Sequence, residues 1–270
     1  MKDMIGYVNR KKKKTNLGKI WNFILTIILP VLILTAWELA VRCGKLNGNV
    51  VPAPSKLLET FLGLVSSGKL MEGLLISFKR VLIGFVIASI LGVLIGFFMG
   101  LFASVNRALS SLVNILRPIP TVALVPIFII AMGIGEGANI AIIIVGALWS
   151  VLLNTTAGVM SVDRKLMELA YVYRISKVKA VFKIILPSAL FSIFTGLRLG
   201  IGGAWMSVVA AEMIGATSGI GYMITFAKSL AQAANMYVLV LVIGIIGFLI
   251  DRILLIFQNV VQKKFCGITA

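Results

Sequence analysis

The run VLIGFVIASILGVLIGFFMGLF, residues 81–102, contains no charged side chain and one hydroxyl, that of Ser89. About 20 consecutive apolar residues are enough for a helix to cross the hydrocarbon core of a bilayer, so the run predicts a membrane-spanning helix. Small residues recur every fourth position on one face of this helix: Gly84, Ala88, Gly92, Gly96 and Gly100. Such a face lets a neighbouring backbone approach closely. It predicts tight helix packing or, alternatively, a surface that slides during transport.

Five further apolar runs have the length of a span, at about 20–41, 109–132, 140–160, 188–210 and 236–257. With 60% hydrophobic and 13% charged residues, the chain has the composition of an all-α integral membrane protein with about six transmembrane helices. An even number of spans places both termini on one side. Lys and Arg accumulate in cytoplasmic segments, and the N-terminal tail is strongly basic. We therefore expect both termini in the cytoplasm.

The charge pattern divides the chain further. We expect a basic cytoplasmic tail at 1–19, a first transmembrane helix at 20–41 and an outer amphipathic segment at 42–80. A five-helix core at 81–257 includes a cytoplasmic loop at 161–187, and a second cytoplasmic tail covers 258–270. In the outer segment, Ser55 follows Pro54 and is a candidate N-cap for a short surface helix.

The chain carries 26 Lys and Arg against 9 Asp and Glu, a formal net charge of +17. In a soluble protein this excess would suggest nucleic acid, but here it follows membrane topology, so no nucleic-acid partner is expected. The absence of histidine excludes a Ser-His protease and an H-E-x-x-H zinc site. Asp251 is the one aspartate near a predicted span, which disfavours an aspartyl intramembrane protease. Cys43 and Cys266 lie at opposite ends of the chain, so neither a metal site nor a disulfide is predicted.

The third predicted span opens with RPIPTVALVP at 117–126. Proline removes a helix hydrogen bond, and broken helices near the midplane are where many transporters bind substrate. The alternative is a helix that begins at Pro118 and has a harmless kink at Pro126.

Three polar residues within or near spans are candidates for a translocation path: Asn154, Arg198 and Glu212. Ionisable groups in a bilayer are costly and usually face the protein interior. Arg198 and Glu212 could therefore pair or line the path, or they could lie near an interface and extend to water. An ion-coupled secondary transporter is the alternative function, and Glu212 would be its coupling carboxylate.

The stretch ELAYVYRISKVKAVFKIILP, residues 168–187, is amphipathic and basic. Its apolar residues recur at helical spacing, at Tyr171, Ile175, Val178, Phe182 and Ile185, and Asp163 is a candidate N-cap just upstream. A helix lying on the membrane surface would explain this pattern.

The same stretch resembles the EAA loop of ABC importer permeases, E-A-A-x3-G-x9-I-x-L-P. Glu168, Ala170, Ile184, Leu186 and Pro187 match position for position, while Leu169 replaces an alanine and Arg174 replaces the glycine. The resemblance implies two short helices that dock in a cleft of a cytoplasmic ATPase. With Arg174 in place of glycine, we expect either a less sharp bend between those helices or a direct contact of Arg174 with the ATPase or a phosphate.

The resemblance covers roughly residues 50–260 and is closest to the type I permease subgroup for nitrate, sulfonate and taurine. The resemblance rests on the segments SFKRVLIGFVIASILGVLIGFFMG, LRPIPTVALVPIFIIAMGIGEGAN, LLNTTAGVMSVD and TGLRLGIGGAWMSVVAAEMI. It implies the transmembrane subunit of an ATP-driven importer in a prokaryotic cell membrane. The implied partners are a second permease copy or a similar permease, two ATPase subunits and an extracytoplasmic substrate-binding protein. The chain has no G-x4-G-K-[ST] motif, so we expect it to be neither an enzyme nor cofactor-bound, with ATP and Mg on the ATPase.

Overall fold

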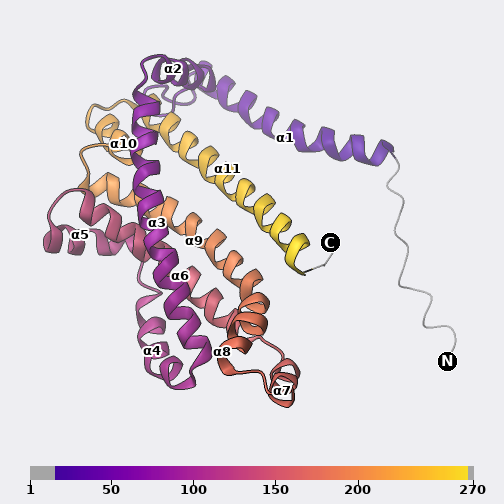
Figure 1. Cartoon of the computed structure of the whole chain (residues 1–270). Coiled ribbons are helices and arrows are strands. Elements are labelled where there is room, and N and C mark those ends of the chain that lie inside the picture. The colour runs from indigo at the N-terminus through magenta and orange to yellow at the C-terminus, as the bar shows by residue number, and fades with distance from the viewer. Residues whose placement is uncertain (1–15, 267–270) are drawn as a thin grey trace. The chain divides into compact units, whose positions relative to one another are not determined.

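The computed structural model describes residues 16–266, with side chains described for 28–258. Every regular element in this part is a helix (Figure 1). The chain forms two units, residues 1–60 and residues 61–270. The predicted basic tail lies mostly outside the described residues.

The first unit contains α1 (Asn16–Arg42) and the beginning of α2 (Pro54–Ser66). The predicted first span lies on α1, although its side chains before residue 28 are not among those described. Ser55 is not the N-cap of α2, because the helix already begins at Pro54. Both the Ser55 amide and its hydroxyl instead donate to the Glu38 carboxylate, at 3.0 and 2.8 Å. A carboxylate from α1 thus occupies the N-terminus of α2, where negative charge is favourable.

The second unit is a bundle of long and short helices (Figure 1). Its elements are α3 (Lys69–Leu101), α4 (Ala103–Leu116), α5 (Thr121–Met132), α6 (Glu136–Met160), α7 (Arg164–Val172), α8 (Lys177–Ala180), a π-helical turn (Val181–Ile185), α9 (Leu186–Gly215), α10 (Ile220–Ser229) and α11 (Ala233–Cys266). In the described part, four helices are long and apolar enough to cross a membrane: α3, α6, the continuous helix 177–215 and α11. The short helices α7 and α8 lie at one end of the bundle and α10 at the other (Figure 1); we call these the α7 end and the α10 end.

The predicted span 109–132 is a bent pair of helices, α4 and α5, whose axes meet at 98°. The break falls at residues 117–120, where Pro118 and Pro120 interrupt the backbone, while Pro126 lies inside α5. Proline cannot donate a backbone hydrogen bond, and it disfavours a helical conformation in the residue before it. A single helix over 109–132 is therefore wrong, whereas the alternative of a helix that begins at Pro118 and contains Pro126 agrees with α5 to within three residues.

The predicted outer segment ends earlier than its pattern suggested. Gly68 separates α2 from α3 in a left-handed conformation with φ 73°, which glycine adopts without strain. No proline follows before residue 81, so α3 begins at Lys69 and continues directly into the predicted span.

The core of the second unit is helix α6, which packs between α3 and α9. The face of small residues on α3 meets α6 at close range: a Cβ built on Gly84 would lie 2.6 Å from Ile143 Cγ2, and one on Gly92 would lie 2.8 Å from Val151 Cβ. On the opposite side, Gly158 of α6 meets Ser192 of α9 at a similar distance. The packing interpretation of the glycine face is confirmed. Since lipid supplies little hydrophobic drive for helix association, this close approach is what holds the three helices together.

We expect Gly92→Ala to lower the free energy of unfolding by about 1–3 kcal/mol, because the added methyl has no room against Val151. Thermal unfolding in mild detergent measures this. Gly244→Ala in α11 is the matched control, since its Cβ would meet nothing within 4 Å. Equal unfolding temperatures for the two variants would contradict the packing interpretation.

Candidate functional site

The predicted coupling loop forms a protruding end of the bundle, built from two short helices. Helix α7 begins at Asp163, whose side chain accepts the Lys165 amide at 2.9 Å, so the predicted N-cap is confirmed. Ser176 caps α8 in the same way through the Lys179 amide. Helix α8 then runs through the π-helical turn into α9 without a break. The loop is thus the exposed end of a long helix, with α7 folded beside it.

The turn between α7 and α8 is tight although arginine stands where the family pattern has glycine. Arg174 adopts the left-handed conformation, with φ 52°. Its amide donates to the Tyr171 carbonyl at 3.0 Å, and the Ile175 amide donates to the Ala170 carbonyl at 2.8 Å. These two bonds define a Schellman motif, the usual glycine-containing ending of a helix. The expectation of a less sharp bend is therefore wrong, because Arg174 adopts the conformation that glycine would supply.

The five residues that match the family pattern, together with Arg174 at its glycine position, divide into two groups. Ala170 is buried, and Ile184 and Leu186 are half-buried, so these hold the loop on the bundle. Glu168, Arg174 and Pro187 are exposed. Glu168 lines a shallow groove on α7 with Arg164, Met167, Tyr171 and Val172.

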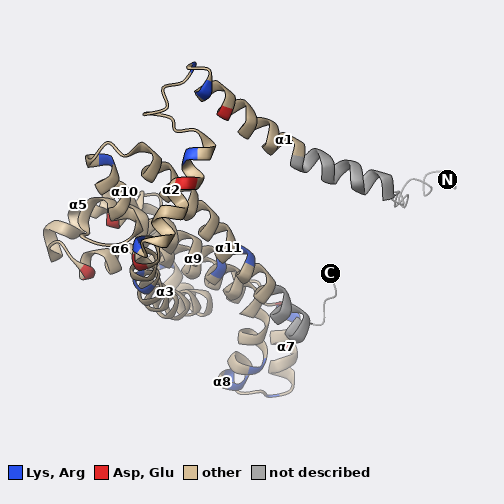
Figure 2. Cartoon of the chain, turned by 90° about the horizontal axis from the view of Figure 1, so that it is seen from above, with Lys and Arg blue, Asp and Glu red and all other residues tan. Residues whose placement is uncertain are grey.

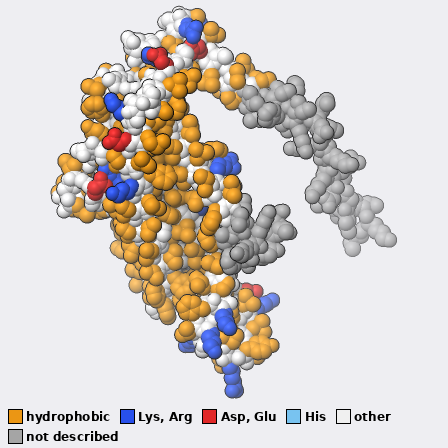
Figure 3. Space-filling view, turned by 45° about the horizontal axis from the view of Figure 1, so that its top comes forward, with side chains coloured by type: hydrophobic (Ala, Val, Ile, Leu, Met, Phe, Trp, Pro, Cys, Tyr) orange, Lys and Arg blue, Asp and Glu red, His pale blue; other side chains and the backbone are white. Residues whose placement is uncertain are grey.

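This end of the chain combines exposed apolar groups with positive charge. Tyr171, Val178 and Phe182 of the predicted apolar stripe are 86%, 66% and 65% exposed. Residues 161–187 contain six basic and two acidic side chains, and blue residues gather on α8 and at this end of the molecule (Figures 2 and 3). In Figure 3 the visible flank of the bundle beyond them is mostly hydrophobic.

The three predicted path residues do not lie together. The Asn154 amide donates to the Ser150 carbonyl of its own helix at 2.8 Å, and its Cβ lies at the close approach of α6 to Gly196 of α9. Arg198 pairs with Asp251 at 2.9 Å rather than with Glu212. The suggested Arg198–Glu212 pair is therefore wrong.

Glu212 instead belongs to a buried network at the α10 end. It is 1% exposed and accepts hydrogen bonds from Arg80 Nη1 at 2.7 Å and from the Ser77 hydroxyl at 2.8 Å. Arg80, itself 3% exposed, also donates to the Ser218 carbonyl at 2.7 Å and forms an ion pair with Glu136 through Nε at 2.9 Å. Arg80 is not among the site residues predicted from the sequence, because residue 80 falls in the predicted outer segment. Its signal is the spacing Ser77-x-x-Arg80, which places both side chains on one helix face.

The network fixes the start of α10. The Ile220 amide donates to Ser77 Oγ, and the Gly221 amide donates to the Glu212 carboxylate, both at 2.9 Å. Gly219 has φ 103°, and a Cβ there would collide with that carboxylate, so no larger residue fits. A carboxylate from α9 thus caps α10, and α3 is bound to both.

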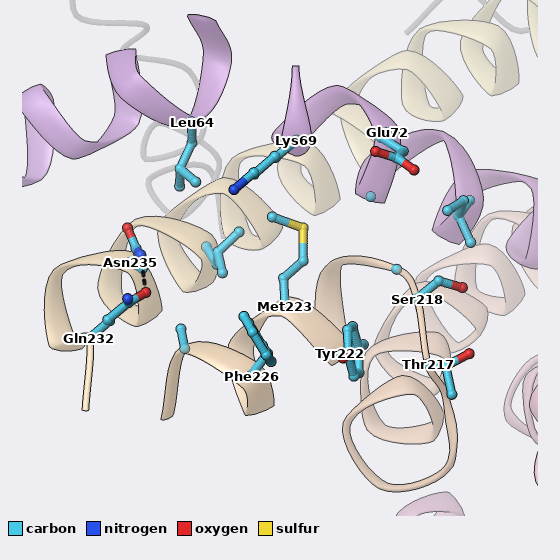
Figure 4. A pocket seen from close by; sticks show the side chains of 15 residues that line it. Leu64, Lys69, Glu72, Thr217, Ser218, Tyr222, Met223, Phe226, Gln232 and Asn235 are labelled. Atoms are coloured by element: carbon cyan, nitrogen blue, oxygen red, sulfur yellow. Dashed lines mark hydrogen bonds between the residues drawn. The ribbon is translucent and has the colours of Figure 1, made fainter. Parts of the chain in front are cut away.

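Beside the network lies a hollow of about 340 Å³ between the start of α3, helix α10 and the start of α11. Lys69 and Met223 point toward one another across it, and Gln232 and Asn235 form a hydrogen bond at one side (Figure 4). Among the described residues, no group of three or more His, Cys, Asp or Glu side chains could hold a metal ion.

Comparison with known proteins identifies the relatives of this chain. A family model described as binding-protein-dependent transport system inner membrane component matches residues 88–265. The nitrate import permease protein NrtB of Synechocystis is 31% identical over 93% of this chain and 94% of its own length. A protein of Escherichia coli named for aliphatic sulfonates transport, SsuC, is 37% identical over 83% of this chain and 85% of its own.

Two solved structures share the fold. A chain of the MetNI methionine ABC transporter in an inward-facing conformation superposes with a TM-score of 0.59 and 22% identity, over 75% of this chain and 98% of its own. A chain of an amino acid ABC transporter also has a TM-score of 0.59, with 17% identity over 74% and 97%. At these identities the likeness concerns the arrangement of helices alone.

We expect Arg174→Gly to stabilise the turn after α7 by about 1 kcal/mol, because a left-handed non-glycine residue carries roughly that cost. Hydrogen exchange at the Arg174 and Ile175 amides should slow accordingly. Lys179→Gly, in the helical backbone of α8, is the control and should speed exchange of its helix. Faster exchange in Arg174→Gly would refute the assigned geometry.

Arg80→Gln should lower the free energy of unfolding by about 3–5 kcal/mol, since it leaves the Glu212 carboxylate buried without a cation. The double variant Arg80→Gln/Glu212→Gln should recover most of the loss, as measured by thermal unfolding in detergent. Lys56→Gln, which breaks an exposed pair with Glu59, should change stability by no more than about 1 kcal/mol. No recovery in the double variant would contradict the pairing.

Proposed function

Because the chain belongs to the family of binding-protein-dependent transport system inner membrane components, we propose that residues 161–187 receive the motion of a partner ATPase. The chain is the transmembrane permease subunit of an ABC importer and lies in the cell membrane. It is a transport component. Three points remain to be assigned: where the ATPase binds, which solute crosses the membrane, and which side chains that solute contacts.

The observation that carries the ATPase assignment is the uncovered apolar and basic surface of the α7 end. Tyr171, Val178 and Phe182 are left largely exposed by the described residues, and exposed patches of this kind mark interaction sites. Glu168 lines the groove on α7 together with Tyr171, and offers one negative charge beside Arg164. The occupant we propose is a cleft on the ATPase surface.

The connection to the spans follows from helix continuity. Helix α8, the π-helical turn and α9 form one unbroken helix from Lys177 to Gly215. A force on α8 therefore acts directly on α9, which contacts α6, α3, α5, α10 and α11. The π-helical turn at Val181–Ile185 is the point where this continuous helix can change its hydrogen-bonding pattern locally.

The complete importer that we propose has two copies of this chain, or this chain and a similar permease. Two ATPase subunits bind ATP and Mg at the α7 end, and a substrate-binding protein delivers solute at the α10 end. We place the α7 end in the cytoplasm, because the basic residues of 161–187 favour that side.

For the solute we propose a small anion. The relatives named above are named for nitrate and for aliphatic sulfonates, both anions at neutral pH. The ion-coupled alternative depended on Glu212 as a coupling carboxylate. That side chain is engaged with Arg80, Ser77 and Gly221 and caps α10, which gives it a structural role instead.

Affinity purification of the tagged chain from native membranes tests the ATPase assignment. We expect a soluble P-loop protein to co-purify near one-to-one, and Glu168→Lys to reduce its recovery at least tenfold while the chain still melts normally. Glu59→Lys, an exposed acid outside the loop, is the matched control and should keep the partner. If Glu168→Lys retains both ATPase and transport, the α7 groove is not the docking site.

A further inference from the structure

An ion pair joins α9 and α11 in the middle of the second unit. Arg198 Nε donates to one Asp251 oxygen at 2.9 Å, and Arg198 Nη2 donates to the other at 3.3 Å. At 1.5 Å per residue, Arg198 lies roughly 18 Å from the start of α9 and roughly 26 Å from its end. A hydrocarbon core is about 30 Å thick, so this pair lies well within the membrane-spanning part of the bundle.

The described residues of the second unit leave the pair partly uncovered. Its side chains are 27% and 51% exposed, whereas those of the Arg80–Glu212 pair at the α10 end are 4% and 0% exposed. A carboxylate half-exposed to hydrocarbon is very unfavourable, so ionisable groups in spans face water or protein. Near Arg198 on α9, the residues Leu199, Gly202 and Met206 are exposed. A charged pair beside apolar exposed residues needs water or a polar partner next to it.

Helix attachment does not explain the pair. Two other contacts already hold α11 on α9: Trp205 Nε1 donates to the Ile243 carbonyl at 3.1 Å, and the Gln258 amide donates to Thr195 Oγ1 at 2.9 Å. Both donor residues are at least nine-tenths buried, as expected of contacts between helices. The Arg198–Asp251 ion pair lies between these two contacts along α9 and α11, and it is the most exposed of the three.

The local charge is positive. Next to Asp251, the Arg252 guanidinium lies 4.9 Å from the centre of the Phe248 ring. Arg198, Asp251 and Arg252 are the charged residues of segments 188–210 and 236–257. Two guanidinium groups against one carboxylate leave a net charge of +1 at this level.

We propose that Arg198, oriented by Asp251, is an anion-accepting site on a water-lined face of α9, and that the transported anion contacts it. This inference rests on the proposed function. Asp251 occupies the Nε–Nη2 edge of the guanidinium, so the Nη1–Nη2 edge is left to donate to two oxygens of an oxyanion. Because Asp251 offsets part of the charge, the anion is held weakly enough to leave again.

Thiol modification tests this without knowledge of the natural solute. Gly202→Cys, in a Cys43→Ser/Cys266→Ser background, places a thiol one turn from Arg198, where a Cβ would meet nothing within 4 Å. The purified transporter in nanodiscs is treated with 2-sulfonatoethyl methanethiosulfonate or its trimethylammonium counterpart. We expect both reagents to react, with the anionic-to-cationic rate ratio falling roughly 3- to 10-fold on Arg198→Gln.

Companion variants separate an anion site from a structural pair. Arg198→Lys should keep the ratio high, Asp251→Asn should raise it, and the neutral double variant Arg198→Gln/Asp251→Asn should leave it low. Leu94→Cys, on an apolar face of α3 that is 52% exposed, is the lipid-facing control and should react with neither reagent.

The inference is overturned if the thiol at position 202 does not react, or if the anionic-to-cationic rate ratio is the same with Arg198 and with Arg198→Gln. Co-purification and ATP hydrolysis are measured on the same nanodiscs. If the ATPase is present and active but the thiol at position 202 does not react, the proposal of an anion site is wrong and the proposed function stands. If no ATPase is recovered, the proposed function itself fails.

Discussion

The close approach of α3 and α9 to the central helix α6 is the constraint on which the rest of the second unit depends. Glycines remove the side chains that would keep the axes apart, so backbone and short side chains meet directly at Gly92 and Val151, and at Gly158 and Ser192. In a bilayer this contact replaces the hydrophobic drive of a water-soluble core. It also fixes α9, and with α9 every polar group that the helix carries.

Two ion pairs on this frame have different environments and therefore different roles. Arg80 and Glu212 are buried, and every charge there has a partner: the carboxylate caps α10, and the guanidinium holds the Ser218 loop. Such a network costs too much to break and serves to position the α10 end. Arg198 and Asp251 are open on one side, and a guanidinium edge remains unused. Burial, rather than charge or residue type, separates a structural pair from a candidate ligand site.

The two ends of the bundle are connected by helix α9. One unbroken helix leads from the exposed surface of α8, past Arg198, to Glu212 beside α10. A movement at the proposed ATPase surface therefore reaches both the open ion pair and the buried network without passing through a loop. The left-handed Arg174 gives α7 a fixed position beside this lever, because its two backbone bonds close the turn between them.

The sequence by itself determined the helical membrane class, the glycine face of α3, the Asp163 cap and the loop with its family pattern, because each depends on neighbours along the chain or on spacing within one helix. The break at 117–120 remained one of two interpretations until the structure showed it, since proline permits either outcome in a bilayer. Only the tertiary structure decided the partners of Arg198 and Glu212. Their contacts come from helices dozens of residues away, and an ion pair depends on which faces the close packing of α3, α6 and α9 brings together. The left-handed Arg174 was decided differently: the bonds that close its turn are local ones to Tyr171 and Ala170, but the sequence pattern does not reveal them because a bulky residue disfavours that conformation.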